Sequence, residues 1–166
     1  MSETATHTDA AAARQPIYLV VVDKTPEMRV ALRFACRQAA RNGGRVALLT
    51  VIEPAEFEHW AMVRDRADDE QRAEAEQTLK HWSTLAKEWS GAIPIIYVRQ
   101  GSVRQQIEAL IAEERRIAGL ILGAGTGAEG PGPIVASLAG RFSEGLRVPI
   151  TIVPGGLTDQ DVDALA

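Results

Sequence analysis

The chain has 166 residues, of which 46% are hydrophobic and 24% are charged, and its formal net charge is −4. These values are ordinary for one globular domain with a single core, and they exclude fibrous and disordered classes. No cluster of five or more Lys and Arg residues occurs, which argues against nucleic-acid and anionic-membrane partners.

The cysteine count and the first residues bear on the compartment. Cys36 is the single cysteine, so an internal disulfide is impossible and a reducing compartment is favoured. Residues 1–15 lack the basic and apolar blocks of a signal peptide, and no apolar run approaches the roughly 20 residues of a membrane span. We therefore expect a cytoplasmic protein with a flexible tail over residues 1–15.

Motifs for metal binding and for hydrolysis are missing from the sequence. His7, His59 and His81 lie in polar segments, and neither an H-E-x-x-H pattern nor a G-x-S-x-G elbow occurs. The sequence therefore supports neither a metal site nor a serine hydrolase.

Apolar runs of strand length alternate with helical patterns along the chain. The predicted strands span residues 17–23, 45–53, 93–98, 118–123 and 148–153. The predicted helices span about residues 26–41, 66–90 and 134–145, with a further helix that begins after Ser102. This order predicts an α/β fold with one parallel, doubly wound sheet that helices cover on both faces.

Helix caps and core positions can also be predicted. Thr25 is a candidate cap, Ser102 with Gln105 fits a capping box, and Thr158 is followed by Asp161 at the same spacing. Residues 155–166 are either one short helical turn or a loose tail. Three further side chains are assigned to the core rather than to chemistry or an aromatic binding surface: Cys36, Trp82 and Trp89.

Open parallel sheets bind ligands beyond the carboxyl ends of their strands, where the strand order reverses. The residues that the predicted topology places there are Asp23, Val51, Gly101 and the loop that begins at Gly123. The sequence therefore predicts a ligand site at that edge.

Four segments in order, "VVVD", "ALLTVIEP", "YVRQGS" and "LILGAG…VPITIV", resemble the universal stress protein family. The resemblance covers residues 16–154 and leaves a tail at each end. It implies a Rossmann-like, adenine nucleotide alpha hydrolase-like fold with five strands in the order 3-2-1-4-5. It also implies a homodimer and a role in the stress response.

Nucleotide-binding members of that family carry G-x2-G-x9-G-[ST] after the fourth strand. Here the matching positions hold Gly123, Thr126 and Ala136-Ser137, and Gly127 can replace the second glycine after a one-residue slip. The resemblance implies that Asp23 and Val51 contact the adenine and ribose, and that Gly123, Thr126 or Gly127, and Ser137 surround the phosphates.

The physical chemistry of this loop is mixed. Glycines allow a ligand to approach the backbone closely, but Pro131 and Pro133 have no N–H to offer a phosphate. If Glu129 faced the site, it would repel a triphosphate by about 1–4 kcal/mol. A triphosphate, a monophosphate and a purely structural turn therefore all stay open, whereas a P-loop is excluded because Pro131 follows Gly130. A dinucleotide fingerprint starting at Gly123 is disfavoured because it follows the fourth strand.

The function expected from these observations is a stress-responsive, non-catalytic protein that binds ATP or AMP. The alternative is a nucleotide-independent, dimeric interaction protein of the same fold, associated through the last strand from Val148 to Val153. Catalysis is disfavoured; a weak ATPase would have Asp23 and Glu129 as its acidic candidates.

Overall fold

The structure is a computed structural model, and it describes residues 15–54, 61–138 and 145–166. In these ranges five strands form one parallel sheet in the order β3-β2-β1-β4-β5, which confirms the predicted fold and strand order. The strands are β1 (Ile17–Val21), β2 (Arg45–Ile52), β3 (Ile95–Gln100), β4 (Ile117–Ala124) and β5 (Ile150–Pro154).

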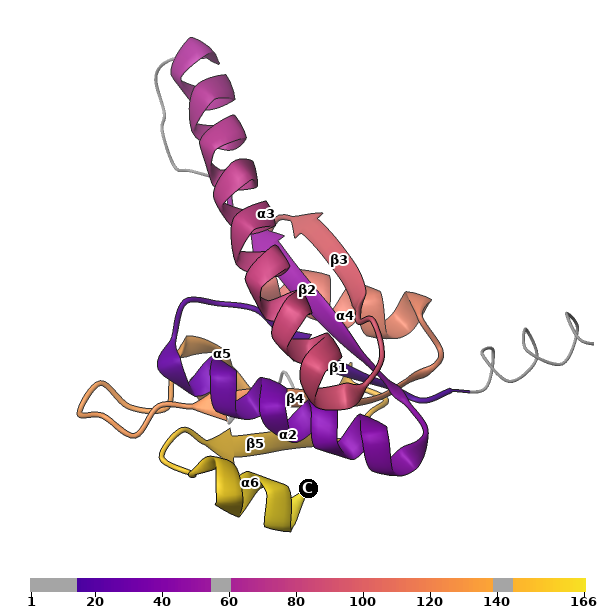
Figure 1. The fold of residues 1–166 in the computed structure, drawn as a ribbon. Helices are drawn as coiled ribbons and strands as arrows, with labels where there is room; N and C mark the ends of the chain where they lie inside the picture. The colour runs from indigo at the N-terminus through magenta and orange to yellow at the C-terminus, as the bar shows by residue number, and fades with distance from the viewer. Residues whose placement is uncertain (1–14, 55–60, 139–144) are drawn as a thin grey trace, which may run out of the picture.

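Helices pack on both faces of this sheet (Figure 1). They are α2 (Pro26–Asn42), α3 (Ala61–Ser90), α4 (Val103–Glu113), α5 (Pro133–Leu138) and α6 (Asp159–Leu165). Because strand side chains alternate between faces, one core gathers Val20 and Leu48 with α2 and α3, and the other gathers Leu19 and Leu49 with α4. None of the helices in the described ranges is both long and apolar enough to cross a membrane.

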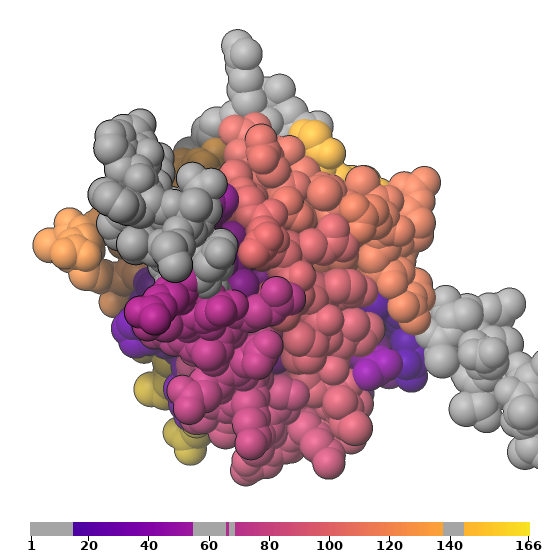
Figure 2. All heavy atoms as spheres, turned by 90° about the horizontal axis from the view of Figure 1, so that it is seen from above, coloured from indigo at the N-terminus to yellow at the C-terminus, as the bar shows by residue number. Residues whose placement is uncertain are grey.

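Helix α3 begins earlier than the sequence predicted. It starts at Ala61 rather than near residue 66, and its first turns project beyond the sheet (Figure 1). In the view from that end, much of the visible surface belongs to α3 and to the segment that holds β3 and α4 (Figure 2). Turns that pack on no sheet need no apolar stripe, so a pattern-based prediction misses them.

Other boundaries differ as well: β1 ends two residues before the predicted end at residue 23, and β5 begins two residues after the predicted start at residue 148. Strand β3 lies two residues later than residues 93–98, because its pairing with β2 runs from Ala47 opposite Ile95 to Ile52 opposite Gln100. Helix α5 ends at Leu138 in the described chain, and residues 139–144 of the predicted helix lie outside the described ranges. Residues 1–14, which include His7, and His59 also lie outside them.

The predicted caps had different outcomes. Thr25 and Ser102 occupy the N-cap positions of α2 and α4, as predicted, but neither forms the side-chain hydrogen bond of a cap, and the Thr25 hydroxyl donates to Asp23 Oδ1 at 2.6 Å instead. The Asp23 carboxylate holds the Thr25 side chain in this position because it also accepts the Thr25 N–H, at 2.8 Å, in a turn that leads into α2. The capping box of Thr158 and Asp161 is confirmed.

The core assignments of Cys36, Trp82 and Trp89 are confirmed. Cys36 is fully buried between α2 and α3, and desolvation raises the pKa of its thiol to about 12. Trp82 and Trp89 are partly buried against the same core.

Glycines let the start of α2 pack closely on β4 and β5. A Cβ atom at Gly123 would overlap the carbonyl oxygen of Glu27 and lie 2.7 Å from its carbonyl carbon. A Cβ atom at Gly155 would lie 2.7 Å from the Glu27 Cβ. The backbone of Glu27 at Gly123, and its Cβ atom at Gly155, therefore occupy space that any larger residue at these two positions would need.

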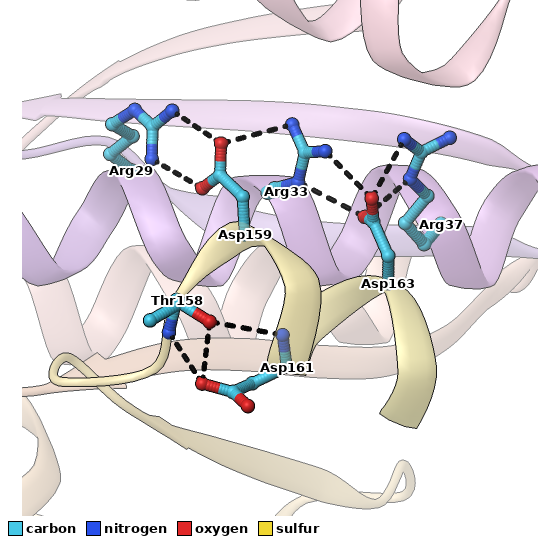
Figure 3. A network of polar contacts seen from close by, with 7 residues as sticks. All are labelled: Arg29, Arg33, Arg37, Thr158, Asp159, Asp161 and Asp163. Carbon is cyan, nitrogen blue, oxygen red and sulfur yellow. Dashed lines mark hydrogen bonds and ion pairs between the residues drawn. The ribbon is translucent and has the colours of Figure 1, made fainter.

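The end of the chain forms helix α6, which packs on α2 through a ladder of ion pairs (Figure 3). Arg29 donates two hydrogen bonds to Asp159, at 2.8 and 3.0 Å. Arg33 donates two to Asp163, at 3.0 and 2.8 Å, and Arg37 donates to the same carboxylate at 2.8 Å. The spacing of four residues on each helix aligns the partners, and Val162 is fully buried beneath them.

The ladder makes a prediction about acid stability. Hydrogen bonds from Arg33 and Arg37 lower the pKa of Asp163 from 3.8 to about 2. A lowered folded-state pKa gives stability that is present above pH 4 and is lost as the pH falls toward 2. We expect Asp163→Asn to lower the Tm by a few degrees at pH 7 and to match the wild type near pH 2, measured by calorimetry.

The control variant for this measurement is Asp69→Asn, which removes an exposed charge on α3. It should leave the Tm close to that of the wild type at both pH values. An Asp163→Asn penalty of the same size at pH 7 and pH 2 would contradict the role of the charged ladder.

The glycine contacts give a second prediction. Gly123→Ala should destabilise the fold by about 1–3 kcal/mol in urea unfolding, because the added methyl group meets the Glu27 backbone. Gly127→Ala is the matched control: its Cβ would meet no atom within 4 Å, so stability should stay the same or rise by up to about 1 kcal/mol. Equal stabilities of the two variants would disprove the close contact.

Candidate ligand-binding cleft

The carboxyl edge of the sheet is hollowed where β1 lies between β2 and β4, the point at which the strand order reverses. Two adjoining hollows of about 400 and 510 Å³ lie there, within the size range of small-molecule sites. The smaller we call the α3 hollow and the larger the loop hollow; together they form the cleft. Both are lined by Val21, Asp23, Glu53, Val103 and Ile134.

The α3 hollow lies between the ends of β1 and β2 and the side of α3. Thr50 and Val51 come from β2, and Gln71 and Thr78 come from α3. An exposed ion pair of 2.6 Å between Lys24 Nζ and Glu74 Oε1 joins the loop after β1 to α3. Both members of this pair line the α3 hollow.

The loop hollow lies between the start of α2, the end of β4 and the segment that leads into α5. Its lining includes Glu27, Met28, Arg104, Gly123, Pro131 and Ser137. The carboxylate of Glu27 reaches the loop after β4, because a Cβ atom at Gly125 would lie 3.1 Å from its Oε1.

The structure brings four of the seven predicted site residues together. Asp23 lines both hollows, Val51 lines the α3 hollow, and Gly123 and Ser137 line the loop hollow. Strand β1 and the turn after β4 therefore contribute to one cleft, as the predicted sheet required.

The other three predicted residues lie outside the lining of the cleft. Gly101 has a φ of 124° and donates its N–H to the Ile52 carbonyl at 3.0 Å, so it ends the β2–β3 ladder. Thr126 and Gly127 are exposed, and the methyl carbon of Thr126 faces the turn after β5, 3.7 Å from a Cβ atom at Gly156. The slip between Thr126 and Gly127 in the family motif thus concerns residues away from the cleft.

Two predicted contact residues already have partners within the protein. Asp23 Oδ1 accepts the N–H and the hydroxyl of Thr25, but a carboxylate has further acceptor sites for a ligand hydroxyl. The Ser137 hydroxyl donates to the Ile134 carbonyl at 2.7 Å. In this arrangement Ser137 offers a ligand an acceptor rather than the donor that a phosphate requires.

The loop after β4 is a turn that bonds to itself. The Gly125 N–H donates to the Pro131 carbonyl at 3.3 Å, and the Gly130 N–H donates to the Gly127 carbonyl at 3.1 Å. Gly130 and Gly132 have φ values of 85° and 96°, which only glycine adopts readily. These glycines therefore shape the turn, and the amides of Gly125 and Gly130 do not point at a ligand.

Carboxylates outnumber cations around the cleft. The acidic lining residues are Asp23, Glu27, Glu53 and Glu74, and the basic ones are Lys24 and Arg104. The Lys24 ammonium is paired with Glu74, and the Arg104 guanidinium is paired with Glu108 at 3.1 Å. The field in the cleft therefore disfavours a polyanion.

Glu27, rather than Glu129, is the carboxylate that would repel a phosphate in the loop hollow. Glu129 is exposed at the loop and does not line the cleft, whereas the half-buried Glu27 does. The sequence analysis missed this because the position of Glu27 depends on the packing of α2 on Gly123.

Sequence reasoning also missed Thr50 and Gln71. Thr50 is a polar residue inside the apolar run 45–53, and this interruption was a signal that could have been used. Gln71 gave no such signal, because its place over the end of β2 depends on how α3 crosses the sheet.

Several solved structures share the fold. The universal stress protein UspA from Lactobacillus plantarum is 20% identical with a TM-score of 0.70, covering 84% of this chain and 98% of that one. A universal stress protein from Archaeoglobus fulgidus in complex with dAMP is 19% identical with a TM-score of 0.54, covering 83% and 96%.

A third structure is a universal stress protein in complex with cAMP; it is 15% identical with a TM-score of 0.60, covering 84% of this chain and 97% of that one.

Among curated proteins none matches. The family model described as "Universal stress protein family" matches residues 17–154, which end at β5 and leave α6 beyond the match. The chain therefore belongs to the universal stress protein family.

Proposed function

We propose that this chain is a stress-responsive protein that binds an adenine mononucleotide without turning it over. The observation that carries the proposal is the cleft at the reversal of strand order, with its apolar walls and with Asp23 lining both hollows. The complexes of two fold relatives with cAMP and dAMP support the choice of an adenine nucleotide with one phosphate.

The lining of the cleft suits the parts of such a ligand. Val21, Val51 and Ile134 supply apolar surface for a planar base. Asp23 has acceptor capacity for ribose hydroxyls, and the loop hollow has room for one phosphate beside Arg104. A triphosphate would place more negative charge near Glu27 and Asp23, so we favour AMP over ATP.

The residue types in the cleft support the proposal that the protein only binds its ligand. The described lining residues include no histidine or cysteine, and Asp23 is held in its turn by Thr25. A hydrolase would need a positioned base or metal to activate water. A cytoplasmic location, inferred from the lone Cys36, stays a prediction.

Titration calorimetry with AMP, ADP and ATP tests the proposal. We expect AMP to bind saturably and ATP to bind about fivefold more weakly, because about 1 kcal/mol of repulsion changes the affinity by that factor. Glu27→Gln should reduce the difference in affinity between AMP and ATP, since it removes one negative charge from the loop hollow. Glu129→Gln is the matched control and should leave the difference unchanged.

Two outcomes would contradict the proposal in different ways. No heat with millimolar AMP would remove nucleotide binding itself. Tighter binding of ATP than of AMP, unaffected by Glu27→Gln, would leave nucleotide binding intact and disprove the charge argument.

A second proposal concerns assembly: we propose that the chain forms a homodimer through its last strand. Strand β5 is an edge of the sheet, and Ile152 on it is 46% exposed. An edge strand with unpaired backbone groups and exposed apolar side chains favours association with another strand. Dimerisation of this kind would also serve the alternative function, a nucleotide-independent interaction protein.

Light scattering tests the dimer. The wild type should show about twice the 17.9 kDa chain mass, and Ile152→Lys should show the chain mass. Ile96→Lys is the matched control, since Ile96 is 41% exposed on β3 at the opposite edge. A monomeric wild type at micromolar concentration, or equal effects of the two variants, would overturn the proposal.

A further inference from the structure

We propose that Thr50 and Gln71 form a hydrogen-bonding subsite in the α3 hollow that recognises the amino-bearing edge of a nucleobase. The inference rests on the proposed nucleotide binding and deepens it, because it names two side chains that recognise the base.

Two buried polar atoms lead to this inference. Thr50 is 9% exposed, and neither its Oγ1 nor the Gln71 Oε1 has a hydrogen-bond partner in the part of the chain that the structure describes. Buried polar atoms are nearly always paired, because an unpaired one has lost its water without replacement. Both of these side chains line the same hollow.

The positions of the two side chains follow from the fold. Thr50 shares the α3-facing side of β2 with Leu48, while its neighbour Val51 packs with the opposite core. Gln71 lies four residues before Ala75, which lines the hollow as well. Strand β2 and helix α3 thus each contribute one polar group to the α3 hollow.

A third polar side chain of the α3 hollow already has a hydrogen-bond partner within the protein. Thr78 also lines the α3 hollow, but its Oγ1 donates to the Glu74 carbonyl of its own helix at 2.9 Å. The Thr78 hydroxyl therefore needs no ligand as a partner, whereas Thr50 Oγ1 and Gln71 Oε1 have no partner among the described residues.

The chemistry of the two groups defines that partner. A carboxamide oxygen accepts from an amine, and a hydroxyl can donate to a nearby ring nitrogen. Adenine presents an amine beside ring nitrogens, and glutamine is a standard partner of that edge. Ile52, which lines the same hollow, provides apolar contact for the ring.

The charges around the α3 hollow argue for the base rather than the phosphate at this end. Asp23, Glu53 and Glu74 line it, and its one cation, Lys24, is paired with Glu74 among the described residues. A neutral ring with an outward-facing amine is compatible with this field, whereas a phosphate is repelled by it. The ligand then extends past Asp23 into the loop hollow.

Calorimetry with AMP, with purine riboside 5′-monophosphate, which lacks the amine, and with ribose 5-phosphate tests the subsite. We expect the wild type to bind AMP about fivefold more tightly than the analogue without the amine. Gln71→Leu should abolish this preference, and Thr50→Val should weaken AMP about three- to tenfold. Binding of ribose 5-phosphate should not change in either variant.

The controls are Gln77→Leu and Thr84→Val, which make the same chemical changes on α3 outside the cleft. The Thr84 hydroxyl donates to the Lys80 carbonyl at 3.0 Å, so its removal breaks a formed hydrogen bond. Both variants should bind all three ligands as the wild type does.

A measurement without ligand tests the premise separately. Thr50→Val should raise the Tm by a few degrees, because a methyl group replaces a buried hydroxyl that has no partner. Thr84→Val should not raise it. A lower Tm for Thr50→Val would show that the hydroxyl is paired inside the protein and would overturn the subsite.

The binding outcomes separate this inference from the proposed function. If the wild type binds AMP while Thr50→Val and Gln71→Leu keep its affinity and its preference for the amine, the subsite is disproved and nucleotide binding stands. If the wild type binds neither nucleotide, the proposed function fails and the subsite fails with it.

Discussion

The contact between the first turn of α2 and the ends of β4 and β5 decides most of what the cleft can do. Gly123 and Gly155 leave room for the backbone and the Cβ atom of Glu27, so α2 begins directly over the end of the sheet. This close approach places Asp23 and Thr25 at the reversal of strand order and turns the Glu27 carboxylate toward the loop after β4. A glycine that resembles part of a phosphate motif thus has a packing role in this chain.

The same contact sets the charge of the site. Because Glu27 lines the loop hollow, the acidic character of the cleft is built into the packing of α2 rather than added at its rim. Lys24 and Arg104 line the cleft as well, but each is paired with a glutamate. The two hollows then differ in character: one offers unpaired neutral polar atoms, and the other offers space next to a cation.

The sequence was sufficient to predict features that depend on local pattern. The buried runs ending at Asp23 and Glu53 have the composition of central parallel strands, and β1 and β2 begin where those runs begin. The Thr158 box was also predictable because it lies within four residues. The hydrogen bond from the Thr25 hydroxyl to Asp23 could not be predicted, because a capping motif does not show which neighbouring side chain accepts.

Features that depend on how elements meet were out of reach. Nothing in the sequence around Gln71 shows that this helix turn covers the end of β2, and nothing near Glu27 shows that it faces Gly125. The packing of α6 was hidden for the same reason: Arg29 and Arg33 belong to an ordinary helix until Asp159 and Asp163, about 130 residues later, are placed opposite them.

The arginine ladder has a spectroscopic consequence. The Arg29 and Arg33 guanidinium carbons lie 5.3 and 5.4 Å from the ring centroid of Trp89, while their nitrogens hold the carboxylates of α6. Detachment of α6 would free both cations from those carboxylates and change the electric field at the indole. The emission of Trp89 is therefore an intrinsic optical reporter of whether the last helix is in place.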